Sequence, residues 1–244
     1  DIGNYNHKHE YNAVVTIPTC TTQGYTTYTC ECGDTYVAEG LVQNNGTYRV
    51  LNAAGLSYFS DKSVADGTVI ELIADIDFNG AEFKAIAAGY NKSLTFKGNN
   101  HTIKNVKLVT CSHNTVGAAS LFFCYPGGTI NVSDLVVEGA TSEGAKYVGT
   151  ILGYTQGNAT LKNITVKDSE ISGVKKIGGL VGFVEASTSS FIAENCHIVN
   201  TKVEATEYIV KISGTSTAGD VNQSNLKLDG TNFVSSAGNL KSAL

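Results

Sequence analysis

Short runs of alternating hydrophobic and polar residues fill the chain from about residue 67 onward, and Gly and Asn residues separate these runs. Residues 130–137 and 161–166 have the two-residue period of a strand with one buried face. Residues 94–106 and 192–198 have the same character. The pattern therefore predicts an all-β region that is built from many short strands.

The short strands recur about every 30 residues. The apolar segments 119–124, 149–154, 178–183 and 210–215 have centres that are 30, 29 and 32 residues apart. A unit of this length cannot bury its own inward side chains, whereas stacked units form a continuous core. We therefore expect a parallel β-helix of roughly five coils. A β-sandwich with accidental similarity between the segments is the alternative.

Equivalent side chains of successive coils should form columns inside the tube. The first predicted column contains Leu121, Ile151, Leu180 and Ile212. A second one places Cys124 beside Tyr154 and Phe183. Glycines should relieve crowding where the coil bends, at Gly149, Gly178, Gly179 and Gly182. We expect three cysteines to fill buried positions, namely Cys111, Cys124 and Cys196; a Cys111 to Cys124 disulfide is the alternative.

One helix is predicted before the strands, at residues 52–60. Asn52 is a favourable N-cap residue, and Leu56 and Phe59 lie three residues apart on one face. Asp66 and Gly67 form a turn after the helix. The chain is therefore expected to have three parts: a small Cys- and His-containing β module (1–40), a linker with an N-terminal capping helix (41–66), and the β-helix with a strand-like C-terminal segment (67–244).

Two of the repeated segments carry a recognisable motif. Residues 176–183 (KIGGLVGF) and 147–154 (YVGTILGY), with 73–79 and 96–103, resemble the GLUG-type repeats of bacterial surface proteins. The resemblance extends over residues 48–200. It implies a right-handed parallel β-helix of the kind found in large adhesin-like polypeptides, and it implies no catalytic residues.

Three of the six cysteines lie in residues 1–40, together with His7 and His9. Cys20, Cys30 and Cys32 with His9 (or His7) would supply the four ligands of one structural zinc ion. A disulfide from Cys20 to Cys30 or Cys32, or three unliganded thiols, are the alternatives. Residues 9–36 are similar to a short Cys-containing repeat of gut-bacterial surface proteins, which has two residues between its last cysteines where this chain has one.

Acidic residues offer one further candidate site. Asp75 and Asp77 are two residues apart on a predicted strand, so they share a face on which they would bind a cation or flank a glycosidic bond. A solvated pair beside a turn is the alternative. Other carboxylates, such as Asp168 and Glu170, are scattered along the sequence. No nucleophile elbow, phosphate-binding loop or zinc-protease motif is present, so we expect no enzymatic activity.

Composition narrows the partners and the location. The chain has 17 Lys and Arg against 22 Asp and Glu, a formal net charge of -5, so it lacks the basic surface that nucleic acids require. No apolar run approaches the roughly 20 residues of a membrane-spanning helix, so we expect no membrane insertion. A chain that begins Asp1-Ile2 and contains no Met indicates that an upstream segment was removed. The abundance of Thr, Asn and Gly and the low Lys content favour a product that is secreted or held at the cell surface, and a domain cut from a longer protein is the alternative.

Two non-catalytic roles fit these features. An adhesin would use exposed tyrosines such as Tyr90, Tyr147 and Tyr208 as stacking platforms for a host or extracellular glycan. A structural subunit would pair the strand-like segment 221–244 with another copy or a surface polymer, which gives head-to-tail filaments. We therefore expect a non-enzymatic structural or adhesive protein, and a self-assembling filament subunit as one form of it. The alternative is a β-helix protein that binds or cleaves a polysaccharide.

Overall fold

The computed structural model describes the backbone of residues 11–16, 25–30, 35–44, 47–112, 116–142, 145–185, 190–205, 208–209, 221–224, 227–229 and 232–235. Side chains are described for residues 40, 41, 43, 47–112, 116–142, 145–185 and 190–205. Within this part of the chain almost all regular structure is strand, and α1 (Ala53–Ser57) is the one α-helix. The fold is therefore all-β, as the alternating pattern predicts.

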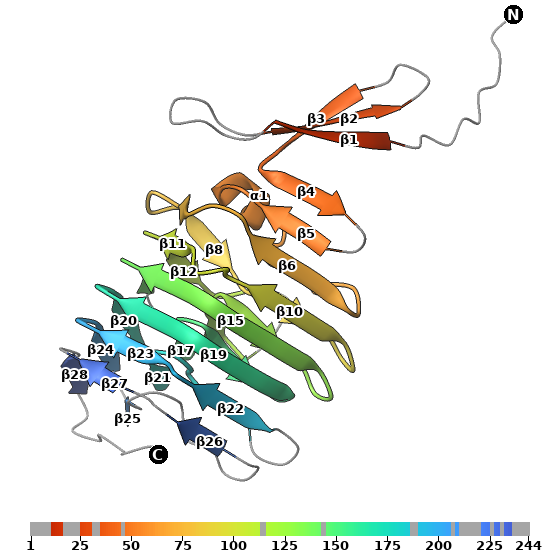
Figure 1. Cartoon of the computed structure of the whole chain (residues 1–244). Coiled ribbons are helices and arrows are strands. Elements are labelled where there is room, and N and C mark those ends of the chain that lie inside the picture. Colours follow the sequence, from red (N-terminus) through yellow and green to blue (C-terminus); the bar gives the residue numbers. More distant parts are fainter. Residues whose placement is uncertain are drawn as a thin grey trace, which may run out of the picture.

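The strands form five sheets, which Figure 1 shows. The N-terminal sheet is antiparallel and contains β1 (Tyr11–Thr16), β2 (Tyr25–Cys30) and β3 (Thr35–Glu39). Sheet I has 12 strands, which are β4 (Leu41–Asn44), β5 (Thr47–Val50), β6 (Thr68–Leu72), β7 (Ile76–Asp77), β10 (Ser93–Lys97), β11 (Thr102–Lys104), β15 (Thr129–Glu138), β19 (Asn158–Lys167), β22 (Phe191–Glu194), β23 (His197–Val199), β26 (Val221–Ser224) and β27 (Lys227–Asp229).

The other three sheets are smaller. Sheet II contains β8 (Glu82–Lys84), β12 (Lys107–Val109), β16 (Thr141–Ser142), β20 (Glu170–Gly173), β24 (Lys202–Ala205) and β28 (Asn232–Ser235). Sheet III contains β13 (Ala118–Ala119), β17 (Tyr147–Gly149), β21 (Lys176–Gly178) and β25 (Tyr208–Ile209). Sheet IV contains β9 (Ile86–Ala88), β14 (Phe122–Cys124) and β18 (Leu152–Thr155).

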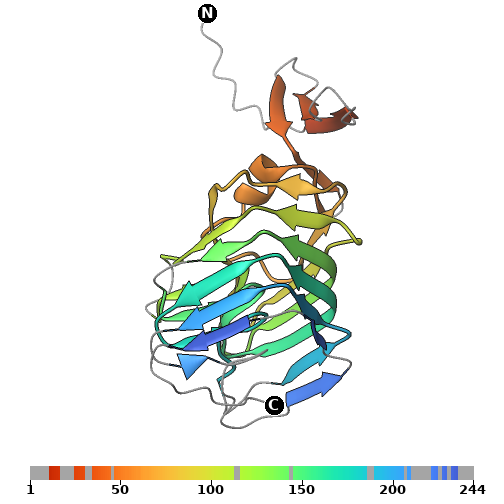
Figure 2. The same cartoon turned by 90° about the vertical axis from the view of Figure 1, so that its left-hand side faces the viewer.

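Strands that are related by the repeat pair in parallel. In β15 and β19, for example, Ile130 lies opposite Ala159 and Val137 lies opposite Val166. From β10 to β18 the chain passes twice through sheets I, II, III and IV. The next two passages, which begin at β19 and β22, use strands of sheets I, II and III before the chain returns to sheet I. Each passage lies beside the previous one, and we call one passage a layer (Figures 1 and 2). The alternative of a β-sandwich is wrong for the described residues, because sandwich sheets are built from antiparallel strands.

The first predicted column is confirmed where the structure describes it. The backbone N–H of Ile151 donates to the carbonyl oxygen of Leu180 (3.0 Å), and that of Leu121 donates to the carbonyl oxygen of Thr150 (3.1 Å). The three aliphatic side chains are buried in the main core, at most 1% exposed. Ile212 lies outside the described residues. Like residues of successive layers therefore share one interior.

The second predicted column is wrong by one residue. Cys124 pairs with Thr155, not with Tyr154, because the register between β14 and β18 shifts at this point. Phe123 is the residue that stacks on Tyr154, with ring centroids 5.8 Å apart, and Tyr154 in turn contacts Phe183 at 5.3 Å. These three rings belong to a second apolar cluster beside the main core, whereas Cys124 lies in the main core.

The predicted crowding at the bends is confirmed at three of the four glycines, Gly149, Gly179 and Gly182. A Cβ atom on Gly182 would lie 2.5 Å from the carbonyl oxygen of Gly153, and one on Gly149 would lie 2.3 Å from that of Leu152. A Cβ atom on Gly179 would lie 2.7 Å from the side chain of Ile198. Gly149 and Gly182 are therefore required by close packing against backbone atoms, whereas the neighbour of Gly179 is the end of a flexible side chain.

Two corners of each layer use residues in the left-handed backbone region. The first corner contains Asp134 (φ 55°), Asn163 (φ 54°) and Asn195 (φ 52°). The second contains Asn105 (φ 51°), Gly139 (φ 64°), Asp168 (φ 50°) and Asn200 (φ 44°). Asn and Asp tolerate this conformation better than other residues with a Cβ atom. The many Asn residues of the chain therefore have a structural role at the corners, which the repeat analysis did not identify.

The predicted helix and its cap are confirmed. Asn52 is extended and its Oδ1 accepts a hydrogen bond from the backbone N–H of Gly55 (3.0 Å). Leu56 and Phe59 are buried, and the ring of Phe59 packs edge-on against Tyr48 of β5. The turn at 66–67 is also present, with Gly67 at φ 73°.

The three cysteines of residues 67–244 are buried thiols, as predicted. The alternative disulfide between Cys111 and Cys124 is wrong. The Sγ atom of Cys111 instead donates to the carbonyl oxygen of Ala118, at 3.5 Å. At the C-terminal side, β27 and β28 are strands, as the sequence pattern predicts, and they pair in parallel with β23 and β24 of the same chain.

Candidate functional site

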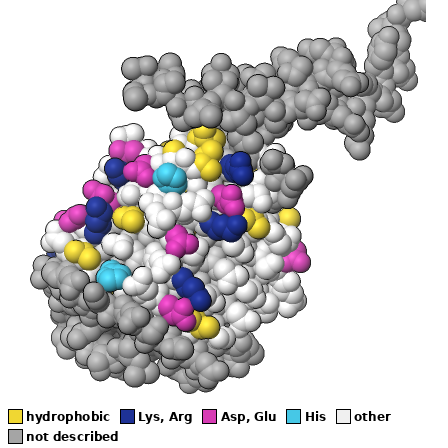
Figure 3. Space-filling model, in the orientation of Figure 1, with side chains coloured by type: hydrophobic (Ala, Val, Ile, Leu, Met, Phe, Trp, Pro, Cys, Tyr) yellow, Lys and Arg dark blue, Asp and Glu magenta, His cyan; other side chains and the backbone are white. Residues whose placement is uncertain are grey.

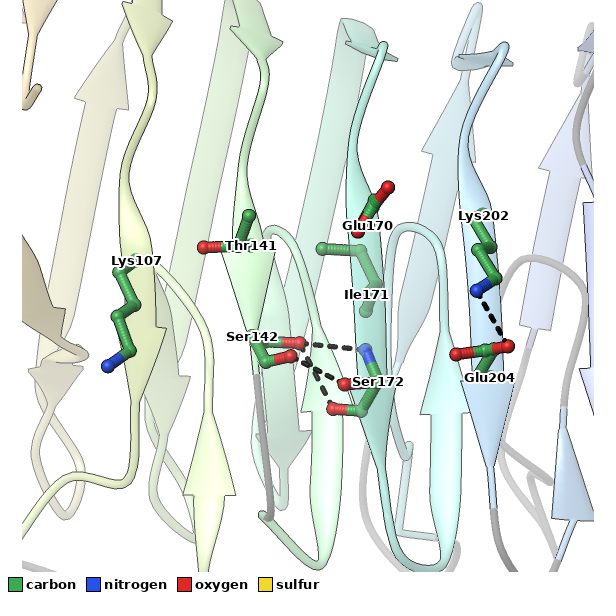
Figure 4. Close-up of a pocket in the computed structure, with 8 residues that line it drawn as sticks. All are labelled: Lys107, Thr141, Ser142, Glu170, Ile171, Ser172, Lys202 and Glu204. Atoms are coloured by element: carbon green, nitrogen blue, oxygen red, sulfur yellow. Dashed lines mark hydrogen bonds and ion pairs between the residues drawn. The ribbon is translucent and has the colours of Figure 1, made fainter. Parts of the chain in front are cut away.

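A polar hollow lies on the outer face of sheet II and spans four layers, from β12 to β24 (Figure 4). Its volume is about 280 Å³, and it is lined by Lys107, Thr141, Ser142, Glu170, Ile171, Ser172, Lys202 and Glu204. A neighbouring hollow of about 340 Å³ shares Glu170 and Lys202 and adds Asp168, Ser169 and Asn200. We call the first of these the sheet II hollow.

The parallel register explains why these side chains come together. Lys107 lies opposite Glu82 on one side and Thr141 on the other. Thr141 lies opposite Glu170, which in turn lies opposite Lys202. These residues form one outward column, because side chains at matched positions of parallel strands point to the same face. The short Thr141 side chain stands between longer neighbours, and this difference in length hollows the surface.

Hydrogen bonds between two serines form the floor of the hollow (Figure 4). The backbone N–H of Ser172 donates to Oγ of Ser142 (3.0 Å), and Oγ of Ser142 donates to the carbonyl oxygen of Ser172 (3.1 Å). Oγ of Ser172 donates to the carbonyl oxygen of Ser142 (2.6 Å). The two strands are thus held together by side chains, and the floor keeps a polar character.

Charged groups at the rim differ in whether they have partners. Nζ of Lys107 lies 3.1 Å from Oε1 of Glu82, and Nζ of Lys202 lies 2.8 Å from Oε1 of Glu204. The hydrogen bond to Glu204 raises the pKa of Lys202, and the charges of Glu204 and Glu170 raise it further. The charge of Glu170 acts on Lys202 of the neighbouring strand, but no hydrogen bond joins its carboxylate to another described residue. This carboxylate is therefore an acceptor that a ligand would find available.

The carboxylates of Asp75 and Asp77 are both exposed on one face, where the sequence places them, but each contacts the next layer. Oδ1 of Asp75 accepts from the backbone N–H of Thr102 (3.0 Å), and this bond lowers the pKa of Asp75. Oδ1 of Asp77 accepts from Nδ2 of Asn105 (3.0 Å), which lowers the pKa of Asp77. Both carboxylates thus have structural partners, as expected of a turn-adjacent pair.

The predicted zinc ligands and the predicted glycan-stacking tyrosines are only partly described by the structure. His9, Cys20 and Cys32 lie outside the described residues, and only the backbone of Cys30 is described, at the end of β2. Among the described residues, no three His, Cys, Asp or Glu side chains converge as metal ligands would. Tyr90 is 64% exposed and packs on Tyr125, with ring centroids 4.7 Å apart.

The two remaining tyrosines are less available as stacking platforms. Tyr147 is half-buried, and its ring contacts Tyr154 at 5.2 Å and Phe183 at 5.7 Å. Nζ of Lys176 lies 3.3 Å from the ring centroid of Phe183 and covers this cluster. Tyr208 lies in β25, where its side chain is not described. Of the three tyrosines, Tyr90 alone is described as strongly exposed.

Ion pairs link the layers on the outer face of sheet I. Glu71 of β6 lies between Arg49 of β5 (3.8 Å) and Lys97 of β10 (2.8 Å). Lys162 pairs with Glu194 of the next layer at 3.0 Å. Acidic and basic side chains are accordingly interspersed over this face, and hydrophobic ones occur as separate spots (Figure 3). This face has no single-signed patch among the described residues.

Sequence reasoning missed the sheet II hollow. Asp168 and Glu170 looked scattered because they were considered along the chain, whereas the fold places them beside Lys202 and Asn200 of the next layer. The available signal was the spacing of the column residues 107, 141, 170 and 202, which are 34, 29 and 32 residues apart. Aligning outward positions as well as inward ones would have found the column.

Comparisons with known proteins identify no family. No family model matches the chain, and no curated protein matches it. A solved structure from Bacteroides ovatus, named "putative immunoglobulin A1 protease", aligns over 82% of this chain and 80% of its own, at 15% identity and a TM-score of 0.43. A similarity of this strength does not establish a shared fold, so neither fold nor activity is transferred from it. No helix in the described part of the chain is long and apolar enough to cross a membrane.

Proposed function

We propose that the parallel stack is a right-handed β-helix and that the protein is a non-enzymatic structural or adhesive protein, secreted or held at the cell surface. A helical winding is supported by the order in which successive layers visit sheets I, II and III, and its right hand is what the resemblance to GLUG-type repeats implies. The resemblance agrees with the stacking, since 147–149 and 176–178 are paired strands with identical positions in the layer. An experimental structure with left-handed winding would contradict this part of the proposal.

One observation carries the structural role. The charged side chains of the outer faces are used to join neighbouring layers, as in the pairs Lys107–Glu82 (3.1 Å) and Lys167–Glu138 (3.0 Å). Exposed pairs of this kind contribute little stability each. They do, however, match the charges of adjacent layers and leave the faces polar and of mixed sign. Such a surface suits a rod that stays soluble while it presents a binding face.

The pKa values of Asp75 and Asp77 do not favour hydrolysis of glycosidic bonds by this pair. A glycosidase needs one carboxylic acid with a raised pKa and a second carboxylate beside it. Hydrogen bonds lower the pKa of Asp66, Asp75 and Asp77, which is the opposite of the shift that a catalytic acid needs. Polysaccharide binding remains the second candidate function, because Glu170 supplies a carboxylate acceptor in the polar lining of the sheet II hollow.

Two kinds of experiment test the proposal: binding of the protein to cell surfaces, and the shape of its particles in solution. The purified protein, coupled to fluorescent beads, should bind bacterial or host-cell surfaces, and beads coated with an unrelated β-sheet protein should not. Electron microscopy and sedimentation would separate single rods from filaments, which is the self-assembling form of the proposal. Release of reducing ends from a panel of acidic and neutral polysaccharides would contradict the non-enzymatic assignment.

Two explanations remain for how the Cys-containing N-terminal module (1–40) is held together. We propose that it is held either by one zinc ion on Cys20, Cys30, Cys32 and His9, or by a disulfide between Cys20 and one of the other two cysteines. Metal analysis together with thiol titration of unreduced protein separates them. The zinc form should carry one equivalent of metal and lose it to a chelator, whereas the disulfide form should hold no metal and lack two titratable thiols.

A further inference from the structure

The sheet II hollow interrupts a charged column at a single position. The column contains Glu82, Lys107, Thr141, Glu170 and Lys202 in successive layers. Neighbouring strands are about 4.8 Å apart, so Lys107 and Glu170 are separated by about 9.6 Å across the strand of Thr141. In the structure Lys107 pairs with Glu82 on its other side. Glu170 therefore has a charged neighbour, Lys202, on one side only, and on the other side it faces the hollow beside Thr141 (Figure 4).

The lining selects a ligand rich in hydroxyl groups. Carboxylates accept hydrogen bonds, ammonium groups donate them, and the hydroxyls of Thr141 and Ser172 do both. A sugar hydroxyl can satisfy each of these groups because it is both donor and acceptor. The hydrogen of the Ser172 hydroxyl is already donated to the carbonyl oxygen of Ser142, so toward a ligand this hydroxyl is an acceptor. The hollow contains two basic and two acidic side chains, so it favours neither an anion nor a cation. It also contains no aromatic side chain, so it has no platform for a flat apolar ligand.

The size limits the ligand to a small unit. Pockets for drug-sized ligands have volumes of about 300–1,000 Å³. The sheet II hollow, at about 280 Å³, lies at the lower end of this range and is open to solvent along the sheet. An open site of this kind can hold one ring of a longer chain, with the rest of the polymer lying along the surface.

We propose that the sheet II hollow binds one pyranose ring of a neutral polysaccharide, with the Glu170 carboxylate accepting hydrogen bonds from ring hydroxyls. This inference rests on the adhesive role proposed above and names the ligand class and the site. Lys107 and Lys202 lie at opposite sides of the ring position and donate to hydroxyl oxygens while they keep their ion pairs with Glu82 and Glu204. Ser172 and Thr141 complete the contacts from the floor.

The test uses the full chain and neutral gluco-, galacto- and manno-oligosaccharides on an array, followed by titration calorimetry. Glu170→Gln keeps the size of the side chain and removes its charge, and it should weaken binding about tenfold. Thr141→Arg fills the hollow with a long side chain and should abolish binding. Glu194→Gln alters a carboxylate of sheet I and should bind like the wild type. Circular dichroism and thermal unfolding verify that each variant is folded.

Several results would overturn the inference. Equal binding by the wild type and Glu170→Gln would place the sugar elsewhere, and this conservative variant remains informative if Thr141→Arg fails to fold. Binding to polygalacturonate alone would show that the site prefers an anionic polymer. Cell adherence without binding to any neutral oligosaccharide would reject the inference and leave the proposed adhesive function standing, whereas sugar binding without adherence would reject the latter.

Discussion

The Nδ2 group of Asn163 donates a hydrogen bond of 2.7 Å to Oδ1 of Asp134, its counterpart in the preceding layer. Nδ2 of Asn195 in the following layer donates to Oδ1 of Asn163 at 2.8 Å. Both bonds run along the stack at a corner where all three residues have positive φ angles. The corner therefore combines two requirements, a left-handed backbone and a side-chain amide that links the layers.

Replacement of Asn163 by Ala should destabilise the protein by about 3–4 kcal/mol. The left-handed backbone costs a residue with an ordinary Cβ atom about 1–2 kcal/mol, and each lost hydrogen bond adds about 1 kcal/mol. Asn163→Gly keeps the φ angle and loses only the hydrogen bonds, so it should cost less. Urea unfolding measures both. Equal losses for Ala and Gly would show that the backbone conformation contributes nothing.

Gly182→Ala should destabilise the protein by about 3 kcal/mol or more, or prevent folding. The new Cβ atom would lie 2.5 Å from the carbonyl oxygen of Gly153 and 2.7 Å from that of Val148, and both are backbone atoms of packed strands. Gly67→Asn is the matched control, because a Cβ atom there meets nothing within 4 Å and Asn tolerates the φ of 73°. Soluble yield and thermal unfolding report the difference, and a Gly182→Ala variant as stable as the control would contradict the account of the bend.

The stability of the protein should fall in acid partly through Asp75. The hydrogen bond from the backbone N–H of Thr102 is the main reason that its pKa is lowered, and His101 and Lys104 act in the same direction. A lowered pKa in the folded state stabilises the fold above the unfolded value of about 3.9, and this stabilisation is lost as the pH falls through the folded value. The side chain is 53% exposed, so solvent screening limits the contribution to about 1 kcal/mol or less.

Unfolding of the wild type and Asp75→Asn between pH 6 and pH 2 checks this expectation. The wild type should be the more stable protein at pH 6, and the difference should shrink below about pH 4, because protonated Asp75 no longer differs in charge from Asn. A difference that stays constant across this range would show that the charge of Asp75 has no part in it.

The thiols of Cys124 and Cys196 should be unreactive in the native protein. Burial raises the pKa of each to about 11. At pH 8 only about one thiol in a thousand would then be thiolate, and the thiolate is the reactive form. Alkylation followed by peptide mass spectrometry should label both residues in denaturant and neither in buffer. Native labelling at the denatured rate would show that these residues are not in the core.

Much of the stack could be predicted from local pattern alone. The alternation of residues 130–137 and 161–166 indicates one buried face, and the spacing of Leu121, Ile151 and Leu180 indicates that equivalent residues repeat. The N-cap at Asn52 was predictable for the same reason, since it depends on residues within one helical turn. These features are determined by neighbours in the chain, so an isolated sequence contains them.

The tertiary structure alone decided the register between layers. The layers differ in length: successive residues of the column from Lys107 to Lys202 are 34, 29 and 32 residues apart. The corners differ in length accordingly. The shift that pairs Cys124 with Thr155 is one result, and the gap at Thr141 beside Glu170 is another. Period and sidedness are local properties of a strand, and the sequence by itself determined them. Which side chains face each other across layers depends on how the corners close against the packed interior, and only the folded chain specifies that.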